Sequence, residues 1–547
     1  MGMLAAMTLS CAGPALAADP SVRVAAGVLQ GRAVGDGAVA AFKGVPYARP
    51  PVDALRWKPP EPTQAWTGVR QAAETGPACM QPNAGPNGFY TDPPPRMSED
   101  CLYLNVWAPK DVKNAPVMVF IHGGALVTGN GGSPRYDGAK LARRGIVVVT
   151  INYRLGIFGF LAHPDLSAES AHKASGNYGT LDQIAALRWV HDNAAAFGGD
   201  PARVTVFGQS AGAHSVYLLM ASPLAHGLFQ GAIAQSGYLP AMPDLRRPAL
   251  GLPGAEAAGA QFAERLGSKR IAGLRAMSAE ALFKAAADNP NSAMGATSSP
   301  VVDGWVQPAQ LFETFEAGRE APVPLMAGFT GGEMKSFDPG ALPPYPASSA
   351  ALEAQVRAAY GPQADAFLRL YPASDVKESS LAAARDSYFG WGTERLLQLH
   401  ARAGRPAWLY YFDHVPAAAA ERGVGSFHSS DVPYVFGNVG PGAIAPRNWP
   451  TPPTAARDIA MSEVVMDYWA AFARTGRPAP AGRPVWPAFT APDGGYLAFR
   501  AGQAFAETNL LPGMFAVQDG QMQRLRAADR AWIWPNTGVW AGSPAAK

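Results

Sequence analysis

The sequence predicts an α/β fold, in which helices cover both faces of a large, mostly parallel sheet. Short apolar runs recur along the chain, helical patterns lie between them, and strands that alternate with helices build parallel sheets. The runs are residues 117–121, 146–151, 204–207, 323–326 and 408–412. Because these runs are apolar throughout rather than alternating, we expect central strands that are buried on both faces.

The helical segments follow from the same pattern. Residues 181–197 and 211–220 have helical spacing and lie next to apolar runs. Two Ala-rich stretches, about residues 250–290 and 350–402, interrupt the alternation, and we expect helical insertions there that cap the sheet. No internal repeat or break in composition marks a second domain, so residues 18–547 are expected to form one domain.

Composition excludes several classes of protein. The chain has 547 residues, of which 48% are hydrophobic and only 16% are charged, and this favours a large core over a disordered chain. The formal net charge is +3 and no basic run occurs, whereas a nucleic-acid binder needs a concentrated basic surface. No run reaches the ~18 apolar residues of a membrane span. We therefore expect neither nucleic-acid binding nor a membrane span.

The N-terminus has the pattern of a secretory signal peptide. An apolar stretch at residues 3–9 is followed by small residues that end in Ala-Leu-Ala at 15–17. This pattern suits cleavage after Ala17 or Ala18. We expect residues 1–17 to be a signal peptide, and the protein to be exported to the periplasm or beyond. The sequence holds no Asn-x-Ser/Thr acceptor, which favours a bacterial source.

Two cysteines follow the signal peptide, Cys79 and Cys101, and they bracket a segment rich in Pro, Gly and Asn. In an exported protein this pair is expected to form a disulfide, which stabilises a loop of this length by about 3 kcal/mol. No Cys and His cluster has the spacing of metal ligands, so a structural zinc site is not predicted.

The first motif with chemical content is Gly-x-Ser-x-Gly at residues 208–212, with Ser210 at its centre. An apolar run leads into it and a helical pattern leads out. A strand-to-helix elbow holds the serine in a strained turn, and the flanking glycines let neighbouring backbone approach. The hydroxyl then projects at the C-terminal edge of the sheet, where open α/β sheets bind ligands. The context predicts that Ser210 is a nucleophile.

A second motif is a Gly-rich loop that begins at His122, directly after the run 117–121. Small residues let backbone N–H groups point at a substrate oxygen. Gly124 and Ala125, with Ala211 from the elbow, are therefore predicted to form an oxyanion hole. We expect His122 to fix this loop rather than to act as a base. The loop lacks the Gly-Lys-Ser/Thr of a phosphate-binding loop and the spacing of a dinucleotide fingerprint.

Further segments accompany these motifs in a fixed order along the chain. They are residues 42–48, 98–106, 152–156, 177–179, 208–212 and 486–487. Together they resemble the type-B carboxylesterases, the α/β-hydrolase family that includes the cholinesterases, over nearly all of the mature chain. The resemblance implies a sheet of eight or more strands, a Ser-Glu-His triad, an acyl-enzyme intermediate, and no metal or organic cofactor.

In α/β-hydrolases the acid and the histidine follow the nucleophile in chain order. His428 lies in a loop that resembles the catalytic-histidine segment of the family, and we predict that it is the base. His414, directly after the run 408–412, is the alternative. His400 ends a helical pattern and is expected to be a solvated or capping residue.

Glu333 is the predicted acid, because it follows an apolar run and a Thr-Gly-Gly turn and matches the acid position of the family. Asp303 is its main rival, although the resemblance makes Asp303 structural. Asp413 is expected to be a supporting or surface group. Gln209 stands where the family commonly has Glu, which removes one negative charge near the site.

These residues predict a carboxylic ester hydrolase that acts on small to bulky small-molecule esters. A serine amidase or peptidase uses the same triad and is the alternative. A non-catalytic binding protein of this family is expected to have lost the nucleophile, the histidine or the small loop residues, and all are present. Candidate pocket walls are Leu126, Phe158, Trp305, Phe337, Tyr388 and Phe389.

Overall fold

The fold is built on an eleven-stranded sheet with the order β16-β15-β14-β13-β12-β11-β9-β10-β8-β4-β3. The computed structural model describes residues 19–82, 88–90, 93–287, 297–337, 342–490, 494–533 and 536–541. The expected signal peptide, residues 1–17, lies outside these ranges. The seven strands from β10 to β15 in this order pair in parallel, and the strands at both edges pair antiparallel. The large, mostly parallel sheet is as predicted.

The strands of the main sheet are β3 (Arg32–Val34), β4 (Val39–Pro46), β8 (Tyr103–Pro109), β9 (Ala115–Ile121), β10 (Val147–Ile151), β11 (Gly199–Gln209), β12 (Gly231–Gln235), β13 (Leu325–Thr330), β14 (Ala407–Phe412), β15 (Gly495–Arg500) and β16 (Gln503–Thr508). Two small sheets contain β1 (Ser21–Val24), β2 (Gly27–Gln30) and β5 (Val69–Gln71), and β6 (Ala78–Cys79) and β7 (Met97–Ser98). The five predicted apolar runs are strands β9, β10, β11, β13 and β14.

The helices are α1 (Ala139–Ala142), α2 (Gly156–Phe160), α3 (Pro164–Glu169), α4 (Tyr178–Asn193), α5 (Ala211–Ala221), α6 (Ala255–Arg265), α7 (Ile271–Arg275), α8 (Ala279–Ala287), α9 (Leu311–Glu316), α10 (Ser349–Tyr360), α11 (Ala364–Leu370), α12 (Val376–Arg385), α13 (Trp391–Arg402), α14 (Ala417–Glu421), α15 (Val432–Phe436), α16 (Ala456–Thr475) and α17 (Met514–Ala527). Helices α6–α8 and α10–α13 fall within the two stretches expected to be insertions. A π-helical turn, Asp386–Gly390, joins α12 to α13. Across the described ranges, no helix combines the length and the apolar composition that a membrane span requires.

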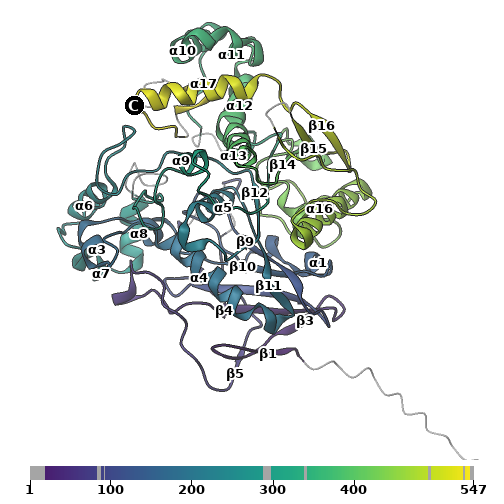
Figure 1. The fold of residues 1–547 in the computed structure, drawn as a ribbon. Helices are drawn as coiled ribbons and strands as arrows, with labels where there is room; N and C mark the ends of the chain where they lie inside the picture. The colour runs from purple at the N-terminus through teal and green to yellow at the C-terminus, as the bar shows by residue number, and fades with distance from the viewer. Residues whose placement is uncertain are drawn as a thin grey trace, which may run out of the picture.

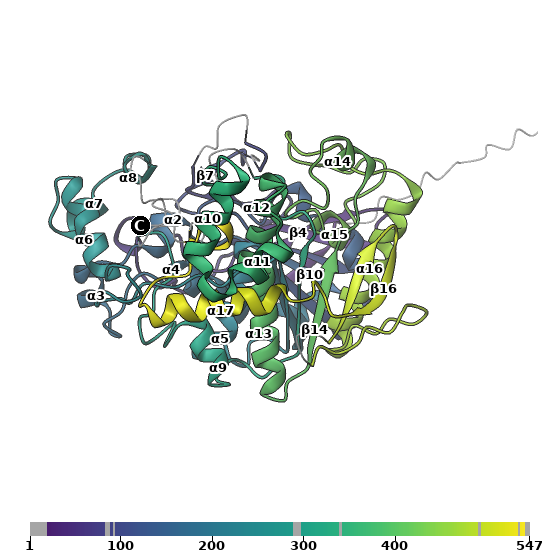
Figure 2. The ribbon, with the colours of Figure 1, turned by 90° about the horizontal axis from the view of Figure 1, so that it is seen from above.

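The sheet separates two hydrophobic cores. Along β9, Val117, Val119 and Ile121 pack into the core that contains α4, α5 and α13. Met118 and Phe120 point the other way, into the core that contains α1, α15 and α16. Figures 1 and 2 show the strands between these two layers of helices. Because successive side chains of a strand point to opposite faces, a strand buried on both faces must be apolar throughout.

Candidate active site

Ser210 occupies the tight turn between β11 and α5. Its backbone has φ 59° and ψ −123°, a conformation that costs a non-glycine residue about 1–3 kcal/mol and that only the surroundings can impose. The Ser210 N–H donates to the carbonyl of Gln235 at 2.8 Å, and the Ser210 carbonyl accepts the His214 N–H at 2.9 Å. Gly212 is required because a Cβ there would collide with the carbonyl oxygen of Ile121. The serine is therefore held in the strained elbow that the motif predicted.

In the loop after β9, the carbonyl groups of Gly123 and Gly124 accept hydrogen bonds from other residues of the same loop. The His122 Nδ1–H donates to the Gly123 carbonyl at 2.8 Å. The Gly124 carbonyl accepts the N–H groups of residues 127 and 128 at 3.0 and 2.9 Å. In a trans peptide the C=O and the following N–H point in opposite directions. The N–H groups of Gly124 and Ala125 therefore point away from these bonds.

Gly124 and Ala125 lie in the same cavity as Ser210, which has a volume of about 260 Å³. Ala211 is the first residue of α5, so its N–H has no acceptor within the helix. In the part of the chain that the structure describes, none of the three N–H groups of Gly124, Ala125 and Ala211 donates to a protein acceptor. Such a site favours a negative charge, and the helix N-terminus adds to that preference.

Glu333 and His428 contact each other directly. The His428 Nδ1–H donates to Glu333 Oε2, and Glu333 Oε1 accepts the Thr330 N–H at 2.7 Å. Both side chains are buried. The Gly332 N–H donates to the Ser426 carbonyl at 2.9 Å and so joins the turn after β13 to the histidine loop. A carboxylate on Nδ1 leaves Nε2 as the nitrogen that can accept a proton.

His428 lines the same cavity as Ser210. Its Nε2 accepts a hydrogen bond from Gln209 Nε2 at 3.2 Å. The rings of Phe337 and Phe389 lie 5.5 and 4.8 Å from the imidazole, centroid to centroid. The His428 imidazole therefore has a carboxylate on one nitrogen, an amide on the other, and aromatic rings beside it.

The alternative histidines have structural partners. His414 Nε2 lies 2.7 Å from Asp458 Oδ1, and both side chains are buried. The expectation that His400 is solvated or capping is wrong. Because α13 packs against the sheet, its last turn buries His400 completely, with Nδ1 2.9 Å from Glu320 Oε1.

The alternative carboxylates are also engaged elsewhere. Asp303 Oδ1 accepts three backbone N–H groups, from residues 305, 306 and 307, at 2.9, 2.8 and 2.9 Å. It therefore closes a turn, as the resemblance implied. Asp413 is exposed and accepts the Ser426 hydroxyl at 3.0 Å.

Burial shifts two titratable groups near the site. It lowers the pKa of His122 to about 4, so His122 is neutral and donates to Gly123 rather than serving as a base. It raises the pKa of Asp431 to about 6, although the Gln235 amide and the Tyr410 hydroxyl donate to this carboxyl at 2.8 and 3.0 Å. Sequence reasoning missed Asp431, since a carboxylate three residues after a histidine has no distinctive pattern.

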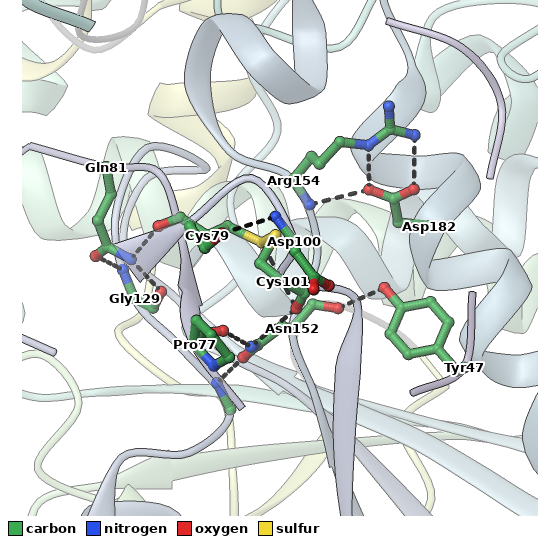
Figure 3. Close-up of a disulfide and its surroundings, with 12 residues drawn as sticks. Tyr47, Pro77, Cys79, Gln81, Asp100, Cys101, Gly129, Asn152, Arg154 and Asp182 are labelled. Atoms are coloured by element: carbon green, nitrogen blue, oxygen red, sulfur yellow. Dashed lines mark hydrogen bonds and ion pairs between the residues drawn. A yellow bond between two sulfur atoms is a disulfide. The ribbon is translucent and has the colours of Figure 1, made fainter. Parts of the chain in front are cut away.

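Cys79 and Cys101 are joined by a disulfide with an Sγ–Sγ distance of 2.01 Å (Figure 3). No group of three His, Cys, Asp or Glu side chains within the described residues could hold a metal ion. The cavity of Ser210 brings together a serine hydroxyl, an imidazole and backbone N–H groups.

Two of the six predicted pocket walls lie at the site, and Leu126 and Tyr388 are not among the described residues that line the cavity of Ser210. Phe337 lines the cavity of Ser210, and Phe389 contacts His428. Phe158 and Trp305 were wrong, because each lines a different cavity. Trp305 stacks on His172 with a centroid distance of 3.9 Å. The sequence could not separate these residues, because large aromatic residues face several cavities in a chain of this size.

Comparison with known proteins agrees with this geometry. Residues 18–511 match the family model described as "Carboxylesterase family". The chain is 39% identical to a fumonisin B1 esterase from Sphingopyxis macrogoltabida, in an alignment that covers 83% of the chain and 82% of the relative. It is also 38% identical to a para-nitrobenzyl esterase from Bacillus subtilis, over 82% of the chain and 88% of the relative. A solved PNB esterase structure covers 92% of the chain and 99% of its own, with a TM-score of 0.76 and 32% identity. A Geobacillus stearothermophilus carboxylesterase gives a TM-score of 0.75 at 34% identity, over 91% and 99% of the two chains.

Proposed function

Because the chain belongs to the carboxylesterase family, an α/β-hydrolase family, it is an enzyme that hydrolyses carboxylic esters, and we propose that Ser210, Glu333 and His428 form its catalytic triad. One observation carries this assignment. The strained Ser210 lines the same cavity as His428, whose other ring nitrogen is paired with a fully buried carboxylate. This arrangement supports the roles of nucleophile for Ser210, base for His428 and acid for Glu333 that acyl transfer requires.

Acylation begins when His428 Nε2 takes the proton of the Ser210 hydroxyl and Oγ attacks the ester carbonyl carbon. Glu333 stabilises the imidazolium that forms. The carbonyl oxygen becomes an oxyanion that accepts hydrogen bonds from the N–H groups of Gly124, Ala125 and Ala211, and losing one such donor costs about 3 kcal/mol. The carbon–oxygen bond to the alcohol then breaks, and the imidazolium gives its proton to the leaving alcohol.

Deacylation repeats these steps with water. His428 takes a proton from water as the water oxygen attacks the acyl-enzyme, and the same three N–H groups stabilise the second oxyanion. The bond to Ser210 Oγ breaks, and the imidazolium returns the proton to the serine. The Gln209 amide must release Nε2 in each half-reaction, because that nitrogen can accept only one proton at a time.

The test is Ser210→Ala, measured on 4-nitrophenyl butyrate. We expect kcat to fall by about 10⁴-fold or more with the thermal unfolding transition unchanged. Ser222→Ala is the matched control, because Ser222 is buried at the other end of α5 and should retain full activity. Turnover by Ser210→Ala near the wild-type rate would overturn the assignment. An isosteric amide, tested alongside, separates esterase from amidase activity.

We also propose that residues 18–547 form one domain and that the protein is exported after residues 1–17 are removed. The Cys79–Cys101 bond supports this, since disulfides persist in oxidising compartments. The intact mass of the protein recovered from the periplasm or medium should match a chain that begins at Ala18 or Asp19. A full-length mass in the cytoplasmic fraction alone would contradict export.

A further inference from the structure

The buried amide of Gln81 holds the far end of the loop that carries the proposed oxyanion hole. Gln81 Nε2 donates to the Gly129 carbonyl at 2.8 Å, and the Gly129 N–H donates back to Gln81 Oε1 at 2.8 Å. The same Nε2 also donates to the carbonyl of Cys79 at 3.0 Å. Figure 3 shows the Gln81 side chain between these two backbone segments. Gln81 is 4% exposed, so water does not compete for these bonds.

Gly129 packs closely against His122 and Gly123, which precede the proposed oxyanion-hole residues. A Cβ at Gly129, whose φ is 106°, would collide with His122 Nδ1 and lie 2.6 Å from the Gly123 carbonyl oxygen. Those two atoms form the hydrogen bond that orients the peptide group between Gly123 and Gly124, and with it the Gly124 N–H. The N–H of the preceding residue, Thr128, donates to the Gly124 carbonyl and so orients the Ala125 N–H. Both donors therefore depend on where Gly129 lies.

The disulfide is the anchor for this amide. Gln81 follows Cys79 by two residues, and the Cys79 carbonyl is one of its acceptors. A second amide acts in parallel from the other cysteine: Asn152 Nδ2 donates to the Cys101 carbonyl at 3.1 Å, and Asn152 Oδ1 accepts the Gly131 N–H at 2.8 Å. The oxyanion loop is thus tied twice to the disulfide (Figure 3).

We propose that Gln81 is a positioning residue for ester hydrolysis, and that the Cys79–Cys101 disulfide fixes it in place. This inference rests on the proposed oxyanion hole of Gly124 and Ala125. Only an amide supplies both the acceptor for the Gly129 N–H and the donor for two carbonyls. Because the oxyanion exists in the transition state and not in the bound ester, a displaced loop lowers kcat while leaving KM unchanged.

The test compares Gln81→Met and Gln81→Glu with the wild type on 4-nitrophenyl butyrate. Met keeps the length without polar atoms, and Glu keeps the acceptor without the donor. We expect kcat per active site, counted by fluorophosphonate titration, to fall about 10-fold or more with KM within about twofold. Inhibition by a trifluoromethyl ketone, which forms an oxyanion, should weaken by the same factor. The acidic limb of the pH profile should stay in place, because Glu333 and His428 are untouched.

The matched control is Gln71→Met, since Gln71 is exposed and its amide binds only the Gln30 side chain among the described residues, at 2.9 Å. It should leave kcat unchanged. A Gln81→Met enzyme with wild-type kcat per active site, or with a loss confined to KM, would overturn the proposal. If Ser210→Ala is inactive in that case, the triad stands and only the role of Gln81 fails.

The link to the disulfide is tested by the double variant Cys79→Ala/Cys101→Ala. If the disulfide acts through Gln81, adding Gln81→Met to the double variant should cost less than about twofold further in kcat. Losses that multiply would show that the disulfide and Gln81 act independently, and would refute this part of the proposal.

Discussion

Replacing Gln209 with Glu should move the acidic limb of the pH–activity profile upward. Gln209 Nε2 lies 3.2 Å from His428 Nε2, the nitrogen that must be unprotonated to act as a base. Opposite unit charges at that distance attract by about 5 kcal/mol at an effective dielectric constant of about 20. Burial of the new carboxylate and its repulsion from Glu333 oppose this attraction. A net displacement of about 1–3 pH units is expected, as for other opposite charges this close.

The sign follows from the protonation state. The new carboxylate stabilises the imidazolium, so the inactive form persists to higher pH. The assay is kcat/KM for a 4-nitrophenyl ester across the acidic and neutral range, normalised by fluorophosphonate titration. Gln209→Met is the control, because it removes the amide without adding charge. It also removes a hydrogen bond to the unprotonated Nε2, so its limb should move upward by less than that of Gln209→Glu. If every Gln209→Glu active site reacts with the fluorophosphonate but the acidic limb stays at its wild-type position, the reasoning is refuted.

Two further predictions concern the buried acids. Glu333→Gln should lower kcat by about 10⁴-fold with little change in KM, because the imidazolium loses its counter-charge; a loss below tenfold on the same ester would exclude Glu333 as the acid. For Asp431, burial raises the pKa from 3.8 to about 6, so the folded chain keeps a proton that the unfolded chain has already released. The contribution of Asp431 to the free energy of unfolding is therefore fully present below pH 3.8. It is lost as the pH rises through about 6, and the loss amounts to about 3 kcal/mol. In urea unfolding, Asp431→Asn should show a smaller decline over that window, and an identical decline would contradict the shift.

The parallel core of the sheet could be predicted because burial on both faces leaves a direct mark on the sequence. Strands β9, β10, β11, β13 and β14 are continuous apolar runs. Strands β12 and β15 were missed. In β12, four of the five residues are Gly, Ala or Gln rather than the β-branched and aromatic residues that favour strands. The error at His400 has a related origin, since the end of a helical pattern does not reveal what the helix packs against.

The candidate site could be predicted most directly where the proposed chemistry requires a particular local sequence. Ser210 and the small residues of the oxyanion loop carry motifs that the mechanism itself requires. Glu333 and His428 needed chain order and a family resemblance, because neither stands in a motif as specific as the elbow. Gln81 gave no signal: its partner Gly129 is 48 residues away, and a glutamine in a loop is ordinarily solvated.

Four non-glycine residues around the candidate site hold a strained backbone conformation. Ala125, Leu126, Ser210 and Ser429 all have positive φ, at about 1–3 kcal/mol each. Bonds that hold these segments stabilise the fold and also maintain strain. When a bond such as that between Gln81 and Gly129 is removed, relaxation of the loop returns part of the lost free energy. The unfolding free energy of Gln81→Met should therefore fall less than removal of a buried amide ordinarily costs, while kcat falls by the full factor. Activity is thus a more sensitive measure of this bond than stability.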